Sequence, residues 1–188
     1  KTGRIEWDLE LYKARKVVPT FKGKRGELYV GRNDFWDLAS PPVFFDGSLI
    51  AGGKDGKIYF INPGTGKVKR GLPDAGGDLG SICSPLSIAR VSFLMKKKTL
   101  FFGSLDKKMY AVSAESGKIH WQKPFTDEVT DIVITEKAVW AGFKNGRTAM
   151  CEIMSGMVLV SMELGGGEPY PFTRIGEDLF ACTERGDL

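Results

Sequence analysis

Apolar positions along the chain form short alternating runs, and polar turns that contain glycine separate them. Residues 49–66 and 100–117 align without a gap, and residues 139–156 form a third copy. Each copy has an apolar run ending in a small residue, a turn with Asp or Asn, a second alternating run and a final glycine. Alternation over short runs is typical of half-buried strands joined as hairpins. The pattern therefore predicts an all-β chain built from a repeated hairpin.

The spacing of the copies indicates the size of the repeating unit. Gly142 follows Gly103 by 39 residues, and Cys182, which replaces this glycine in a partial copy, follows Gly142 by 40. Short apolar segments at 40–45 and 84–88 precede two of the hairpins, and another strand follows each closing glycine. A unit of four strands and about 40 residues is typical of a propeller blade.

We therefore expect a β-propeller of four-stranded antiparallel blades. About four to five partial blades are present, so the propeller is expected to be incomplete or part of a larger ring. A β-sandwich, which also has regularly spaced turns, is the alternative. The 24 glycines among 188 residues fit either fold, because tight turns need the positive φ that glycine reaches without a Cβ clash.

The repeats divide the chain into one domain, 1–188. Its expected units are an irregular one at about 1–38, repeats at about 39–73, 80–123 and 126–164, and a partial one at 168–188. Gly31 and Gly52 are only 21 residues apart, so the unit that begins at Leu28 is expected to lack its last two strands. Closure of a ring would pair residues 4–9 with residues 171–188.

Ten residues form the signature of the repeat and are assigned structural roles: Trp7, Gly52, Asp55, Gly66, Gly103, Asp106, Gly117, Trp121, Gly142 and Gly156. At the position of the two tryptophans the other copies have Arg70 and Val160. The order of a Gly-x-x-Asp-Gly hairpin, an alternating strand, Thr-Gly and a strand ending in Trp resembles the PQQ-like (quinoprotein-like) β-propeller repeat. This resemblance covers most of the chain and implies a ring of seven or eight blades, so the chain is expected to be a fragment or a divergent partial propeller.

Composition and charge argue against several classes of function. The net charge is +4 with a pI near 8.9, and the only dense basic run is 96–98, so nucleic-acid binding is not expected. No run of about 18 apolar residues is present, so no membrane span is expected. Cys83, Cys151 and Cys182 are odd in number and far apart, which predicts neither a disulfide framework nor a zinc site.

Groups suited to catalysis are scarce in this sequence. His120 is the single histidine, so a His-based metal cluster cannot be built and a Ser-His-Asp arrangement would depend wholly on this residue. The resemblance implies PQQ and calcium in the enzymes of that family, many of which also use two adjacent cysteines. No such cysteine pair occurs here. We therefore predict no catalytic, cofactor-binding or metal-binding residue, and we favour a protein that is not an enzyme.

The sequence best fits a noncatalytic scaffold or recognition module, because a rigid propeller displays many loops. Its expected partner is another protein or a second copy of itself, with Trp36, which lies outside the repeat register, as a possible anchor. One alternative is a PQQ- and calcium-dependent quinoprotein dehydrogenase or a fragment of one. Another is a luminal stress-sensor-type propeller that dimerises through strand edges. The resemblance alone favours a periplasmic, extracellular or luminal location.

Overall fold

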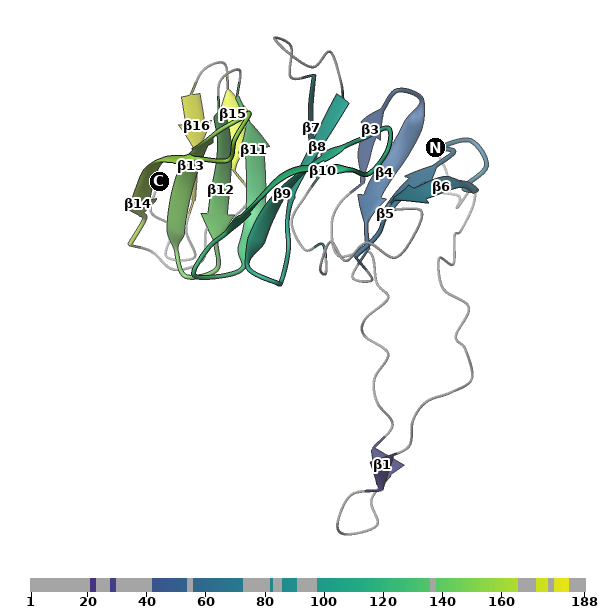
Figure 1. Ribbon diagram of the computed structural model, residues 1–188, viewed down its shortest axis with the longest axis horizontal. Coiled ribbons are helices and arrows are strands. Elements are labelled where there is room, and N and C mark those ends of the chain that lie inside the picture. The colour runs from purple at the N-terminus through teal and green to yellow at the C-terminus, as the bar shows by residue number, and fades with distance from the viewer. Residues whose placement is uncertain are drawn as a thin grey trace, which may run out of the picture.

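The computed structural model describes the chain in ten ranges: 21–22, 28–29, 42–53, 56–72, 82, 86–90, 98–135, 138–165, 172–175 and 178–182. Within these ranges every regular element is a β-strand. Three four-stranded antiparallel sheets stand side by side, each ordered as in the sequence (Figure 1). The prediction of an all-β chain with four-stranded antiparallel units is therefore confirmed.

The strands follow the chain from sheet to sheet. The first sheet consists of β3 (Val43–Phe45), β4 (Ser48–Gly52), β5 (Ile58–Ile61) and β6 (Val68–Leu72). The second consists of β7 (Ser87–Arg90), β8 (Lys98–Gly103), β9 (Lys108–Ser113) and β10 (Ile119–Pro124). The third consists of β11 (Val129–Ile134), β12 (Ala138–Phe143), β13 (Arg147–Glu152) and β14 (Val158–Glu163).

Two further sheets have two strands each. β15 (Thr173–Ile175) pairs with β16 (Asp178–Phe180), and β1 (Phe21–Lys22) pairs with β2 (Leu28–Tyr29). The glycine pattern did not predict the pairing of β2 with β1.

The turn between the third and fourth strands of each sheet depends on its closing glycine. Gly66, Gly117 and Gly156 all have φ of +69°, and each amide donates to the carbonyl four residues earlier at 2.8 to 2.9 Å. A side chain with a Cβ is strained in this conformation. The glycines that close the three copies in the sequence therefore fix the geometry at which each fourth strand begins.

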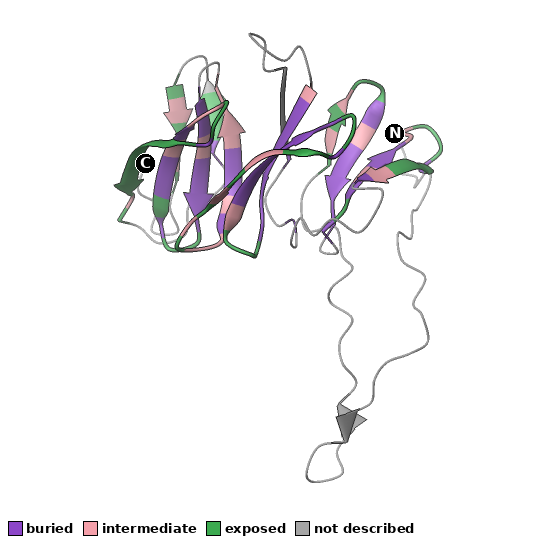
Figure 2. Cartoon of the chain, viewed as in Figure 1, coloured by how far each residue is buried: buried purple, intermediate pink, exposed green. Residues whose placement is uncertain are grey.

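Two layers of apolar side chains hold the three sheets together. Residues of β8 alternate between them: Leu100 and Phe102 face the first sheet, while Phe101 faces the third. This two-residue period is that of a strand buried on both faces. The buried residues accordingly concentrate in the inner strands, as Figure 2 shows in purple. The second sheet is thus the centre of the described core.

Gly103, the last residue of β8, lies directly against the next sheet. A Cβ built on Gly103 would lie 2.5 Å from the Cβ, the Cγ1 and the carbonyl oxygen of Val129. Real Cβ atoms do not approach other atoms this closely, because contacts near 3.5 to 4.0 Å are the favourable ones. The absence of a side chain at Gly103 is what lets β8 and β11 come together.

The fourth strands of the first and second sheets also tie each of these sheets to the following one. On β10, Trp121 donates from its indole Nε1 to the carbonyl of Ile153, at 3.1 Å, and its ring covers Gly156. On β6, the guanidinium of Arg70 donates to the carbonyls of Ala114 and Glu115. Ala114 and Ile153 both lie three residues before a closing glycine. Arg70 of the first sheet therefore binds the second sheet at the position that corresponds to the one Trp121 binds on the third sheet.

Asp131 connects the third sheet to the β15–β16 pair. This β11 residue is buried, and its carboxylate accepts a hydrogen bond from the backbone amide of Phe172, just before β15. Burial raises the pKa of Asp131 above its ordinary value of 3.8, and the hydrogen bonds from the amides of Phe172 and Ile132 oppose that shift. Desolvation of the carboxylate is the largest of these effects.

We expect the stability of Asp131→Asn relative to wild type to increase with pH. Because the folded-state pKa of Asp131 is raised, ionisation of the wild-type carboxyl costs stability as the pH rises from 3.8 through the folded pKa. The amide of asparagine does not ionise and its oxygen can still accept from Phe172. Urea unfolding of both proteins across this interval measures the difference. A difference that is constant, or that grows as the pH falls, would show that Asp131 is not destabilised by burial.

Candidate functional site

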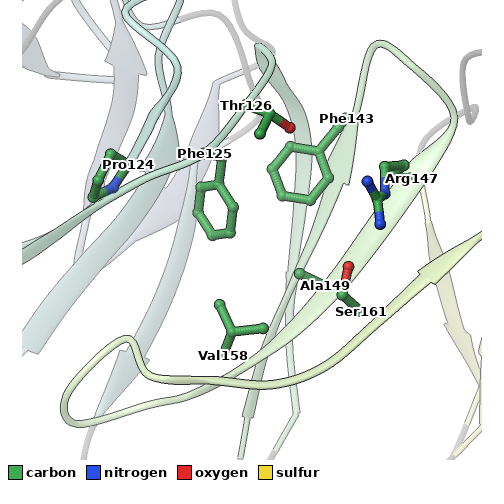
Figure 3. Close-up of a pocket in the computed structure, with 8 residues that line it drawn as sticks. All are labelled: Pro124, Phe125, Thr126, Phe143, Arg147, Ala149, Val158 and Ser161. Atoms are coloured by element: carbon green, nitrogen blue, oxygen red, sulfur yellow. The ribbon is translucent and has the colours of Figure 1, made fainter.

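A pocket of about 290 Å³ opens between the second and third sheets. Pro124 ends β10, Phe125 and Thr126 follow it, and the other lining residues belong to the third sheet: Phe143, Arg147, Ala149, Val158 and Ser161. Figure 3 shows the rings of Phe125 and Phe143 side by side, with Arg147 beyond Phe143. The two ring centroids are 4.6 Å apart. The pocket therefore has an apolar aromatic wall and a cationic group at one end.

Strand register explains why these side chains meet. Ala149 pairs with Ser161, and Arg147 pairs with Glu163, so these side chains share one face of the sheet. A register shift between Met150 and Cys151 brings Val158 onto the same face, opposite Cys151. That face looks toward the second sheet, and the connection after β10 places Phe125 against it.

Arg147 is the cationic residue that lines this pocket, and its charge is not neutralised by an ion pair with any described residue. The backbone amide of Arg147 donates a hydrogen bond to Asn145 Oδ1 at 3.1 Å. The guanidinium is exposed and forms no hydrogen bond or ion pair with any residue that the structure describes, including its cross-strand neighbour Glu163. An arginine offers five donors in a planar fork that matches a carboxylate. It is therefore available to an acidic ligand.

The strand beside the pocket, β14, is exposed along its whole length. All six of its residues are exposed, and they read Val-Leu-Val-Ser-Met-Glu. Met154 and Met157, in the turn that leads into the strand, are exposed as well. Figure 2 shows this strand in green at the edge of the third sheet. Val158 lies on the pocket face of the sheet, whereas Val160 and Met162 pair with Met150 and Thr148 on the opposite face, so exposed apolar side chains flank this edge on both faces.

The other two outer strands carry the features that usually protect a sheet edge. β6 presents Lys69 and Arg70, and β10 presents Lys123 and ends at Pro124. Lysine, other charges and proline at an edge discourage pairing with another strand. In β14 the only charged residue is Glu163, at its end. Among the four-stranded sheets, the third therefore has the least protected edge.

A second pocket, of about 320 Å³, lies between the first and second sheets and contains several charges. Its cations have partners inside the fold: Lys98 binds Asp46 at 2.5 Å, and Lys69 donates to the carbonyl of Gly47 at 2.9 Å. Arg70 is held by two carbonyls of the second sheet and lies 4.0 Å from the centre of the Phe60 ring. These charges hold the two sheets together, so the pocket beside β14 is the better candidate for a ligand.

The residues of the repeat signature lie outside the pocket beside β14. Asp106 accepts from the Lys108 amide at 3.1 Å and from the Tyr110 hydroxyl at 2.5 Å, so it organises its own hairpin. Gly52 and Gly142 are ladder residues, paired with Ile58 and Thr148. Trp7, Asp55 and the possible anchor Trp36 fall outside the described residues.

The histidine and the two described cysteines that the sequence singled out do not line the pocket beside β14. Burial raises the pKa of the Cys151 thiol to about 11, against a smaller lowering by Lys123, so this thiol is a poor nucleophile. Cys182 is exposed, and His120 is half-buried on β10. In the described ranges no three His, Cys, Asp or Glu residues come together as a possible metal site. Nor does that part of the chain contain a helix that could cross a membrane.

Solved structures resemble this chain in fold. The computationally designed Ika4 protein matches 82% of it with a TM-score of 0.65 and 14% identity, over 90% of the Ika4 chain. BamB from Moraxella catarrhalis matches 85% of it with a TM-score of 0.60 and 16% identity. The WD40 domain of Pan2 from Neurospora crassa matches 77% with a TM-score of 0.61 and 11% identity. The fold is a β-propeller.

The propeller spans only 47% of the BamB chain and 41% of the Pan2 chain that it matches. No protein-family model and no curated protein matches its sequence. At these identities the likeness concerns the fold alone, and the PQQ-like repeat stays a prediction.

The repeat signature did not predict the pocket of the propeller. Phe125 and Arg147 are 22 residues apart and belong to different sheets, and only the packing of the sheets brings them together. One signal was available in the sequence. The outer strand 158–163 is apolar at successive positions, whereas the corresponding strands 68–72 and 119–124 contain lysine. An outer strand without alternation indicates a surface that is covered on more than one side.

Proposed function

We propose that this propeller is a noncatalytic recognition module that binds another protein. The observation that carries the proposal is the edge strand β14, which has four apolar residues among its six exposed ones and lies beside a pocket with an aromatic wall. Contiguous exposed apolar surface is uncommon on monomeric proteins and marks interaction sites. The propeller fold supports this role, because its sheets form a rigid frame for such a surface.

The module works without quinone or calcium in this proposal. Its binding energy comes from the burial of the apolar side chains of β14, each of which contributes roughly 1.5 to 3 kcal/mol when fully buried. Interfaces of this kind depend on a few anchoring contacts within a larger area.

Val160→Lys is expected to weaken binding, because a lysine on an edge strand opposes the approach of a second strand or apolar surface. Val68→Lys is the matched control: Val68 lies on another outer strand, β6, and both valines are 40% exposed. Wild type and the two variants are immobilised and exposed to an extract of the source cells. Each protein that is retained is then purified, and its affinity for wild type and for each variant is measured by calorimetry. We expect a partner that binds wild type and Val68→Lys alike and Val160→Lys at least about ten-fold more weakly, or about 1.4 kcal/mol.

Two results would contradict the proposed function. One is that every purified candidate binds all three proteins equally. The other is that the wild-type chain takes up stoichiometric PQQ in the presence of calcium, with a change in visible absorbance, since that would favour an oxidoreductase.

A further inference from the structure

We propose that the partner segment binds as an added β-strand on the outer edge of β14, with an apolar side chain in the pocket and a carboxylate on Arg147. The inference rests on the proposed function and specifies its ligand: an extended protein segment in which an acidic residue lies close to an apolar one.

The edge of β14 provides the backbone contacts. In the described chain β14 has one neighbouring strand, β13, and its other side is exposed. An edge strand presents a row of amide and carbonyl groups that pair with an extended segment. The other outer edges carry Lys69, Arg70, Lys123 and Pro124, which disfavour such pairing. The choice of β14 over β6 and β10 follows from this difference.

The pocket selects the side chain. Val158 and Ser161 of β14 line it, so a strand paired with β14 would direct alternate side chains to the same face of the sheet. On that face an incoming side chain meets Phe125, Phe143 and Val158. A volume of about 290 Å³ with these walls fits one large apolar or aromatic side chain.

Arg147 selects the charge. It lies on the same face as Ser161, one strand further in, and its guanidinium is exposed without a partner among the described residues. The cations of the pocket between the first and second sheets, in contrast, are already paired. Glu163 is the cross-strand partner of Arg147, but the two form no ion pair and Glu163 does not line the pocket. A carboxylate on the added strand would complete a charge-assisted pair.

Selection from a display library of random ten-residue peptides tests the inference with the whole chain as bait. We expect wild type and Val68→Lys to enrich peptides that place Asp or Glu near a large apolar residue. Arg147→Gln should lose the acidic preference while it keeps the apolar one, and Val160→Lys should enrich nothing. Circular dichroism and thermal unfolding check that each variant is folded.

One selected peptide then serves in a double-mutant cycle with its Glu→Gln form. The acidic peptide is expected to bind wild type at least ten-fold more tightly than Arg147→Gln, whereas the amide peptide should bind both alike. Amide hydrogen exchange of β14 should slow when the peptide is bound.

Three outcomes would overturn the inference. Equal binding of acidic and amide peptides by wild type would remove the role of Arg147. Failure to enrich any peptide, together with a solution mass of twice 20.7 kDa that Val160→Lys returns to 20.7 kDa, would show that a second copy covers β14. A partner from the extract that Val160→Lys loses and Arg147→Gln retains unchanged would leave the proposed function standing and refute this ligand.

Discussion

Gly103→Ala is expected to lower the free energy of unfolding by about 3 kcal/mol, at the upper end of the usual cost of overpacking. The added Cβ would lie 2.5 Å from three atoms of Val129, and one of them is a backbone oxygen. A flexible side chain could turn away, but a backbone carbonyl moves only if β11 shifts. For a domain of this size the melting temperature should fall by about 6 to 12 °C.

Gly71→Ala is the matched control for this experiment. Gly71 also lies in a strand, β6, yet a Cβ there would meet its nearest atoms at 3.9 to 4.0 Å, an ordinary contact distance. We expect this control to change the melting temperature little. If the two variants melt together, the close approach of β8 and β11 is not as the structure places it.

Gly156→Ala is expected to cost about 2 to 4 kcal/mol, because it combines a strained backbone with a steric clash. Gly156 has φ of +69°, and a Cβ there would lie 2.7 Å from Cε3 of Trp121. The indole must move, which also disturbs its hydrogen bond to the carbonyl of Ile153. Urea unfolding measures the loss, and a shift of tryptophan fluorescence in the folded state reports the displaced ring.

Gly165→Ala separates the two contributions. Gly165 has a similar φ of +74°, but a Cβ there would meet nothing within 4 Å. This variant should therefore show only the backbone cost, about 1 kcal/mol. Equal losses in the two variants would mean that Trp121 does not cover Gly156.

Much of the fold could be predicted from the sequence because local rules produce it. Turn geometry requires glycine at positive φ, so the positions of Gly66, Gly117 and Gly156 in the sequence mark where each fourth strand begins. Alternating side chains between these turns then indicate strands with one buried face or two. These constraints act within a few residues, and for that reason they repeat visibly along the chain.

The candidate site could not be predicted in the same way, because it depends on contacts between sheets. Arg147 is an ordinary polar residue at the start of a strand, and nothing next to it in the sequence shows that Phe125 lies nearby. The repeat in fact directs attention away from the pocket, since its signature residues serve turns and packing. The positions that depart from the repeat indicate the site better: Val160 occupies the position that Trp121 and Arg70 occupy in the other units.

That one position has a consequence for the way the molecule unfolds. In an array whose units contact only their neighbours, stability is a sum of unit terms and coupling terms. Arg70 and Trp121 supply a polar coupling from one sheet to the next, whereas Val160 has no group that could donate such a bond. The fourth strand of the third sheet therefore lacks this coupling, and hydrogen bonds from Phe172 and Arg174 to β11 join that sheet to the β15–β16 pair instead. Local opening should begin at β14, so the strand proposed to receive a partner is also the one that a partner would stabilise most.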